Sequence, residues 1–133
     1  MLERVEFIAE KQPYPRYLGI KLVKAETDRV VLSLPYNANL GTDRVNGGAI
    51  SSLIDVAGVC ATWAHPKVGV DSFGATVSLT INFLQLATAD DLIATAEVRR
   101  RGGSICVTEV AVTNSDNEEI ALGVVTYKLQ SQK

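Results

Sequence analysis

VNGGAISSLIDVAGVCATWAH, residues 45–65, is the segment around which this chain is built. After Asn46, Gly47 and Gly48, apolar or small residues continue for about five helical turns. A helix that is hydrophobic on nearly every side belongs inside a protein rather than on its surface. We therefore predict a long central helix, and we expect the other elements to wrap around it.

One ionisable carboxylate, that of Asp55, interrupts this apolar run between Gly47 and Ala64. At about 100° per residue it shares a helix face with mostly small residues, namely Gly48, Ser51, Ser52, Gly58, Val59 and Thr62. A face of small residues lets a ligand, another backbone or a partner subunit come close. The alternative is a solvated strip on which the carboxylate meets water or a hydroxyl of Ser51 or Ser52. The helix pattern leaves both interpretations open.

Composition and charge exclude several classes of protein. The chain has 133 residues, of which 47% are hydrophobic and 21% charged, and this fits one globular domain over residues 1–133. Its net charge of −2 argues against nucleic acid as a partner. The sequence has no metal-ligand cluster, no nucleotide-binding glycine loop and no apolar run long enough to span a membrane. With no signal-peptide core either, we expect a cytoplasmic protein in which Cys60 and Cys106 are buried, reduced thiols.

The remaining segments predict a sheet rather than a doubly wound fold. A short surface helix over residues 2–11 is ended by Pro13 and Pro15. Strand patterns follow over residues 19–25, 29–34, 73–84, 92–101, 104–114 and 119–129. In the third of these, Thr76 belongs to the polar face and Leu79 to the apolar face. Because strands do not alternate with helices, we predict an α+β fold with an antiparallel sheet.

The start of the central helix is suited to binding a carbonyl oxygen. A helix amino end carries unpaired N–H groups and about half a positive charge, and Gly47 and Gly48 have no side chains that would block an approaching atom. Such a site stabilises the negative charge that develops when a carbonyl is attacked. Asp55 lies nine positions after Asn46, which is too far to serve the same carbonyl within one chain. Antiparallel pairing of two subunits would bring them together, so we predict a dimer with its sites at the interface.

The sequence NGGAISSLIDVAG, residues 46–58, resembles the motif of the hotdog-fold acyl-CoA thioesterases of the phenylacetate-pathway (PaaI-like) type. In that family the motif is HGG followed by a helix with an aspartate nine positions after the histidine. The resemblance extends over most of the chain. It implies a hotdog fold, in which an antiparallel sheet wraps around a long central helix, and a homodimer or a dimer of dimers. It also implies hydrolysis of an acyl-CoA thioester without a cofactor.

The resemblance further implies roles for individual residues. Asp55 would be the nucleophile or the general base, and the Gly47 amide would be the oxyanion donor. Thr76 matches a strand hydroxyl that helps place the water. Contacts with the substrate are implied for Asn39, Gly48, Arg101, Gly103 and Ser104, the last three beside a Gly-Gly turn where the phosphates of coenzyme A would lie.

One position departs from the family motif, because Asn46 replaces its histidine. Asparagine can cap the helix and donate a hydrogen bond to a thioester oxygen, but it does not titrate near neutral pH. A non-catalytic module that binds acyl-CoA or lipid is therefore the alternative hypothesis. A dehydratase is less favoured, since the single histidine, His65, lies at the far end of the helix. The structural alternatives are a turn former for Asn39 and a solvated hairpin for the run Arg99–Arg101. Strand alternation places Arg99 and Arg101 on one face of this run and Arg100 on the other.

Overall fold

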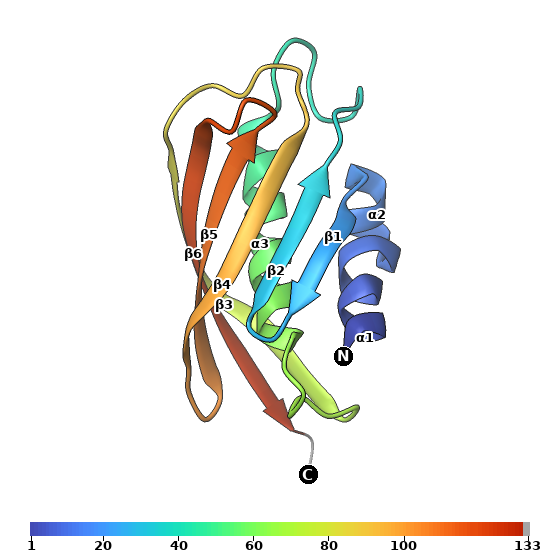
Figure 1. The fold of residues 1–133 in the computed structure, drawn as a ribbon, viewed down its shortest axis with the longest axis vertical. Coiled ribbons are helices and arrows are strands. Elements are labelled where there is room, and N and C mark those ends of the chain that lie inside the picture. The colour runs from blue at the N-terminus through green and yellow to red at the C-terminus, as the bar shows by residue number, and fades with distance from the viewer. Residues whose placement is uncertain (132–133) are drawn as a thin grey trace.

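The computed structural model describes residues 1–131, which form an antiparallel sheet wrapped around a central helix, α3 (Gly47–Trp63) (Figure 1). The sheet has six strands in the order β1-β2-β4-β5-β6-β3, and every neighbouring pair is antiparallel. These strands are β1 (Lys21–Glu26), β2 (Arg29–Leu34), β3 (Ser72–Phe83), β4 (Leu92–Arg101), β5 (Ile105–Asn114) and β6 (Glu119–Ser131). The predicted α+β class, antiparallel sheet and central helix are confirmed.

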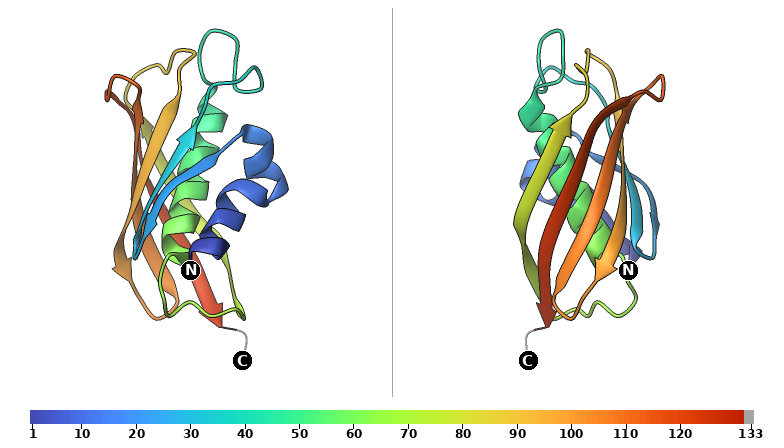
Figure 2. Two further views of the ribbon diagram at one scale, coloured as in Figure 1. Left: turned by 45° about the vertical axis from the view of Figure 1, so that its right-hand side comes forward. Right: turned by 90° about the vertical axis from the view of Figure 1, so that its left-hand side faces the viewer.

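Helix α3 is enclosed because its side chains are apolar on most sides. Leu53, Ile54 and other core residues of the helix are fully buried. At Gly58 the sheet comes especially close, since a Cβ added there would lie 2.6 Å from the side chain of Val125 on β6. The helix ends at Trp63, two residues before the expected end, because the next residue leaves the helical region with ψ at 66°. The sheet and the N-terminal helices lie on different sides of α3 (Figure 2).

The N-terminal arm, defined here as residues 2–18, is helical throughout most of its length. Helix α1 (Leu2–Glu6) continues as the π-helical turn η1 (Phe7–Lys11), and α2 (Pro13–Leu18) follows. The prolines end the first helix as expected, but they also occupy the first turn of a second helix that the sequence analysis missed. Proline fits there because an N–H in the first turn has no partner within the helix. Val5 and Ala9 are fully buried and join the arm to the core.

Strand β3 forms one edge of the sheet, and within residues 1–131 it pairs only with β6. It is twelve residues long, and most of its side chains are exposed. Val77 and Phe83 are 59% and 52% exposed although both are apolar. An edge strand presents backbone N–H and C=O groups that can pair with another chain. The β3 edge is therefore a surface on which the sheet can be extended.

A β-bulge in β3 changes which side chains face α3. The register shifts between Thr76 and Ser78. Thr76 pairs with Tyr127 and Leu79 pairs with Val125, and both partners on β6 contact α3. Thr76 and Leu79 consequently share the helix-facing side of the sheet. The predicted assignment of these two residues to opposite faces is wrong, because strict alternation does not allow for the extra residue of a bulge.

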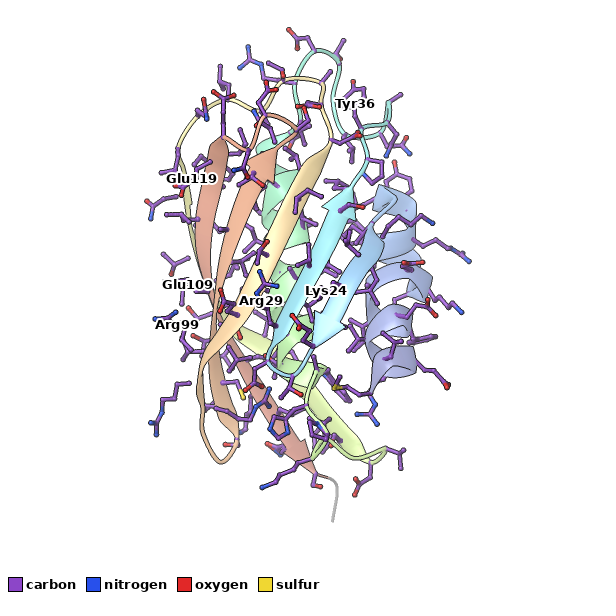
Figure 3. All side chains as sticks on the ribbon, in the orientation of Figure 1. Lys24, Arg29, Tyr36, Arg99, Glu109 and Glu119 are labelled. Atoms are coloured by element: carbon purple, nitrogen blue, oxygen red, sulfur yellow. The ribbon has the colours of Figure 1, made fainter. Side chains whose placement is uncertain are left out.

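A second bulge, just before Arg100, separates the three consecutive arginines. Arg101 pairs with Cys106 and turns toward the carboxyl end of α3, where it is half-buried. Arg99 and Arg100 are exposed, and Arg99 projects away from the sheet (Figure 3). The predicted common face of Arg99 and Arg101 is therefore wrong, again because a bulge interrupts the alternation.

Candidate active site

The amino end of α3 leaves one backbone donor free. The Asn46 side chain caps the helix, with its Oδ1 accepting a hydrogen bond from the Gly48 N–H at 2.7 Å. The Asn46 backbone is extended, with φ −61° and ψ 139°, as is typical of this capping position. The Gly47 N–H donates to no protein atom among residues 1–131. It can therefore donate to a carbonyl oxygen that comes from outside the chain.

Two grooves open on either side of this helix end. One, of about 500 Å³, is lined by Asn46 and Gly47 and by the ring of Phe83 on the edge strand. The other, of about 390 Å³, is lined by the predicted residues Asn39, Asn46 and Gly48. The structure thus brings these three residues together.

Asn39 and Asn37 have different roles in the loop that leads to this helix end. The Asn37 Oδ1 accepts a hydrogen bond from the Asn39 N–H at 2.9 Å, and the Asn37 Nδ2 donates to the Leu18 carbonyl oxygen at 3.0 Å. Asn37 is therefore the turn former. The Asn39 side chain is exposed and makes no hydrogen bond within residues 1–131, so it is free to contact a ligand.

Asp55 is half-buried and is held by a residue of the edge strand. The Thr76 hydroxyl donates to the Asp55 Oδ1 at 2.7 Å. The hydroxyls of Ser51 and Ser52 donate instead to the carbonyl oxygens one helical turn before them, so the alternative in which a serine binds the carboxylate is wrong. No protein donor among residues 1–131 reaches the Asp55 Oδ2. One carboxylate oxygen is thus fixed in orientation and the other is free to accept a proton from water or to attack a carbonyl.

Within one chain, the free amide and the carboxylate are well separated. Gly47 and Asp55 are eight positions apart on α3, which corresponds to ~12 Å along the helix axis. A single carbonyl cannot contact both. The structure therefore places both predicted catalytic groups on the same helix but does not unite them in one site.

The carboxyl end of α3 is closed by Arg101. Its Nη2 contacts the Asp28 Oδ1 at 2.8 Å and donates to the Thr62 carbonyl oxygen at 2.9 Å. The Asp28 N–H donates to the carbonyl oxygen of Ala64 at 2.7 Å. Side chain and backbone together satisfy carbonyl groups that a helix end leaves without partners. The Arg101 side chain is thus not solvated on the hairpin surface, and its guanidinium already has an acidic partner and a carbonyl acceptor within the protein.

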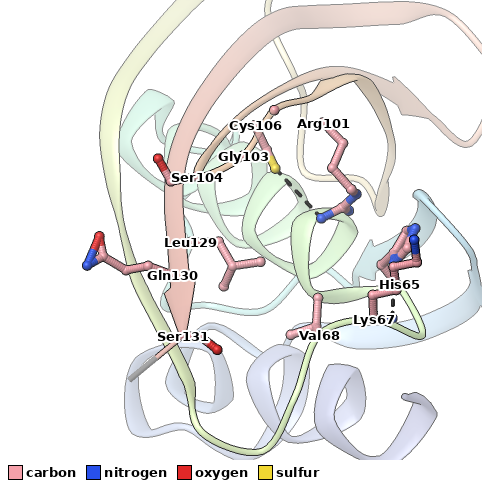
Figure 4. A pocket seen from close by; sticks show the side chains of 11 residues that line it. His65, Lys67, Val68, Arg101, Gly103, Ser104, Cys106, Leu129, Gln130 and Ser131 are labelled. Atoms are coloured by element: carbon pink, nitrogen blue, oxygen red, sulfur yellow. Dashed lines mark hydrogen bonds between the residues drawn. The ribbon is translucent and has the colours of Figure 1, made fainter. Parts of the chain in front are cut away.

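A pocket of about 300 Å³ lies next to Arg101, with Gly103 and Ser104 on its hairpin side (Figure 4). His65 and Lys67 also line it, and neither was predicted to lie near this hairpin. Both follow α3 directly, and chain order alone gives no signal that the β4–β5 hairpin folds against this segment. The pocket therefore unites the three predicted hairpin residues with two further cationic or titratable groups, at the end of α3 opposite to Gly47.

Burial and charge act in opposite directions on Cys106, which also lines this pocket. Burial raises the pKa of its thiol, and the nearby Arg101 guanidinium lowers it to a smaller extent. Burial also raises the pKa of the Cys60 thiol in the core. Both cysteines are buried and free, as predicted.

A third groove, of about 550 Å³, includes Thr76, whose hydroxyl binds Asp55, and was not predicted. It is bounded by Thr76, by the α3 residues Val59 and Trp63, and by residues of the N-terminal arm such as Arg4. Val59, four residues after Asp55, belongs to the helix face that the sequence predicted around Asp55. Nothing in the local sequence indicates that the arm folds back to this point.

Two classes of site are absent from the part of the chain that the structure describes. Within residues 1–131, no three His, Cys, Asp or Glu side chains are grouped so that they could hold a metal ion. No helix in this range is both long and apolar enough to cross a membrane.

Comparison with known proteins identifies a family for most of the central region. Residues 43–121 match the family model described as the thioesterase superfamily. A candidate esterase of Halobacterium salinarum is 30% identical over 124 residues, which cover 85% of this chain and 82% of that protein. The acyl-coenzyme A thioesterase PaaI of Escherichia coli is 28% identical over 116 residues, covering 85% and 79% of the two chains.

Solved structures share the same fold. The Escherichia coli PaaI protein from the phenylacetic acid degradation operon superimposes with a TM-score of 0.86 at 21% identity, covering 99% of this chain and 94% of that one. A thioesterase family protein from Silicibacter pomeroyi superimposes with a TM-score of 0.88 at 24% identity, covering 98% of each chain. The hotdog fold expected from the sequence is confirmed.

Proposed function

The chain belongs to the thioesterase superfamily, and on that premise we propose that it hydrolyses an acyl-CoA thioester to the free acid and coenzyme A. The observation that carries the proposal is the hydrogen bond from Thr76, which lines a groove, to Asp55, because this bond leaves the second carboxylate oxygen of Asp55 free. The relative named as an acyl-coenzyme A thioesterase supports this substrate class.

The proposed reaction uses Asp55 as the group that initiates attack on the thioester carbonyl. In one version the Asp55 carboxylate takes a proton from water, and the resulting hydroxide attacks the carbonyl carbon. In the other, the free carboxylate oxygen attacks directly and water later cleaves the mixed anhydride that forms. In both, the carbonyl oxygen becomes negatively charged, the carbon–sulfur bond breaks, and the coenzyme A thiolate takes up a proton. Thr76 keeps the carboxylate in one orientation throughout.

The Gly47 N–H is the proposed donor to the developing oxyanion. It is free within residues 1–131 and lies at the positive end of the α3 dipole. The Asn46 Oδ1 is occupied by the Gly48 N–H, but the Nδ2 of the same side chain makes no hydrogen bond in this range and can serve as a second donor. This capping geometry explains how an asparagine can stand where the family motif has a histidine.

A homodimer formed through β3 would bring the two catalytic groups together. On one chain, Thr76 marks the position of Asp55 along β3, and Phe83 marks that of Gly47, since a Cβ on Gly47 would lie 3.6 Å from the Phe83 ring. If two β3 edges pair antiparallel about a twofold axis at Thr80, the extra residue of the bulge after Thr76 is left unpaired, and Thr76 lies opposite Phe83 of the partner subunit. The Asp55 of one subunit then faces Gly47 of the partner subunit.

Coenzyme A is proposed to be bound by residues at both ends of α3. Asn39 and Gly48 line the groove beside the oxyanion donor. Gly103 and Ser104 line the hairpin pocket, where Arg101 adds positive charge although Asp28 already occupies part of its guanidinium. Dimers that pair again into tetramers would be compatible with this arrangement.

The test is thiol release from a panel of short, long and aryl acyl-CoAs. We expect turnover by the wild type and a loss of at least about a hundredfold in kcat for Asp55→Asn. Asp116→Asn makes the same change on an exposed turn and should retain full activity. An active Asp55→Asn variant would contradict the proposed mechanism.

The competing function is a non-catalytic module that binds acyl-CoA or lipid. Asn46 is the observation that favours it, because this position cannot titrate near neutral pH. Binding of acyl-CoA by the wild type without any thiol release would replace the thioesterase proposal with this one.

A further inference from the structure

The groove that includes Thr76, the hydrogen-bond partner of Asp55, leads toward the N-terminal arm. It begins at Thr76, and Val59 and Trp63 follow Asp55 on α3 by about one and two turns, so it extends for roughly 12 Å. Its wall is mostly apolar and includes Phe7, Ile8, Val59, Trp63 and Phe73. A groove of this character, at this position, suits the acyl part of a thioester better than the polar arm of coenzyme A, whose amides would find few partners.

Arg4 brings an uncompensated positive charge to the far end of the groove. Its Nη1 donates to the Val68 carbonyl oxygen at 2.8 Å, and its guanidinium lies 5.6 Å from the centre of the Trp63 ring. The other N–H groups of Arg4 donate to no protein atom among residues 1–131. None of the side chains that line the groove in this range is acidic. The Arg4 guanidinium is thus held in place by the Val68 carbonyl oxygen and by the Trp63 ring, and its remaining N–H groups are available to a ligand.

Tyr127 supplies a second donor close by. Its hydroxyl oxygen accepts a hydrogen bond from Trp63 Nε1 at 3.1 Å, which leaves the hydroxyl proton without an acceptor within residues 1–131. Burial raises the pKa of this phenol, so the hydroxyl remains protonated at neutral pH. Trp63 therefore holds both donors in place. Its ring lies against the Arg4 guanidinium, and its Nε1–H donates a hydrogen bond to the Tyr127 hydroxyl oxygen.

We propose that Arg4 and Tyr127 select acyl groups whose far end carries a carboxylate, so that the substrates are ω-carboxyacyl thioesters of coenzyme A. The inference rests on the proposed function, which puts the thioester carbonyl at Asp55 and the acyl group in this groove. A carboxylate matches the free guanidinium N–H groups in charge and in geometry. A neutral alkyl end would leave both donors desolvated and without an acceptor, which is unfavourable.

The structure of the arm supports this assignment. The π-helical turn η1 includes Phe7 and Ile8, which line the groove, and such turns occur frequently at functional sites. Glu10 of the same turn accepts a hydrogen bond from the Leu22 N–H at 2.7 Å and so ties the arm to β1. The arm is therefore held as a fixed wall rather than as a loose terminus.

The experiment compares two substrates of equal chain length, octanoyl-CoA and its ω-carboxy counterpart suberyl-CoA. We expect the wild type to have the higher kcat/KM for suberyl-CoA. Arg4→Met keeps an unbranched side chain at this position but removes the guanidinium, and should lower kcat/KM for suberyl-CoA by roughly tenfold or more while changing that for octanoyl-CoA by less than about twofold. Arg4→Lys should retain part of the preference, and Arg99→Met, on the exposed face, should retain all of it.

Binding of the thioether analogues of both compounds, which contain no ester bond, separates failure of this inference from failure of the proposed function. If no acyl-CoA is hydrolysed but Arg4→Met selectively weakens the carboxylated thioether, the recognition is correct and the hydrolysis is not. If hydrolysis occurs but Arg4→Met affects both substrates equally, or neither, the inference is overturned and the proposed function stands. Equal weakening would indicate that Arg4 contacts the coenzyme A part instead.

Discussion

The two ends of α3 differ in whether their backbone groups find hydrogen-bond partners within the protein. At the amino end, Asn46 occupies the Gly48 N–H but leaves the Gly47 N–H free beside open grooves. At the carboxyl end, Arg101 and the Asp28 N–H bind carbonyl oxygens of the last turn, so that end is satisfied by the protein itself. A free polar group at an otherwise well-built helix end is the feature that indicates a ligand.

This difference also explains why a basic residue near a predicted ligand is weak evidence of binding. Arg101 was predicted to contact phosphate, yet much of its hydrogen-bonding capacity is used by Asp28 and by the Thr62 carbonyl oxygen. Its side chain is 21% exposed. The same guanidinium would therefore have to stabilise the fold and bind phosphate. Substitutions at the two ends of α3 can separate effects on stability from effects on activity.

The largest effect is expected at the open end. Gly47→Pro removes the proposed oxyanion donor and should lower kcat by about a hundredfold or more, because one such donor contributes that much to acyl transfer. Proline is well tolerated at the first position of a helix, and the extended conformation of Asn46 suits a residue before proline. Thiol release under saturating acyl-CoA measures the change.

Gly47→Ala is the matched control, since it keeps the N–H and its Cβ would meet the Phe83 ring at an ordinary 3.6 Å. It should retain most of the activity. If the site is shared between subunits, unfolding and refolding an equal mixture of Gly47→Pro and Asp55→Asn should restore about a quarter of wild-type activity, because half of the dimers then contain one intact site. No recovery in the mixture would contradict the proposed dimer.

A smaller effect, on stability, is expected at the closed end. Arg101→Met removes the partner of Asp28 and of the helix carbonyls, and should lower the free energy of unfolding by about 2 kcal/mol, with only a modest change in kcat. Urea unfolding followed by circular dichroism gives the first value, and the thiol assay gives the second. A large rise in KM for acyl-CoA at unchanged stability would show instead that Arg101 mainly binds phosphate.

The smallest effect concerns the cap itself. Asn46→Ala should lower the free energy of unfolding by about 1 kcal/mol, whereas Asn46→Asp should leave it nearly unchanged, because aspartate caps a helix as well as asparagine does. The aspartate variant should nevertheless lose activity, since it replaces a potential donor with a negative charge beside the oxyanion. Equal stability of the alanine variant and the wild type would mean that the cap contributes little.

The relative placement of several candidate site residues was predictable because they lie close together in sequence. Asn46, Gly47 and Asp55 are placed by one helix, so helical periodicity locates them relative to each other. The orientation of Thr76 toward Asp55 was not predictable from alternation, because the bulge in β3 reverses it. The role of Arg101 depends on Asp28, which is 73 residues away, and no local pattern links the two.

The local pattern of the chain was sufficient for the buried helix, its cap, the strands and the lone carboxylate, because periodicity and capping act over a few residues. Folding in three dimensions formed the groove at Thr76, the partner of Asp55, and it added Arg4 and Trp63 to that groove from segments far apart in sequence. It also left β3 as an exposed edge. These features depend on long-range packing and strand pairing, whose partners are selected by the whole fold rather than by neighbouring residues.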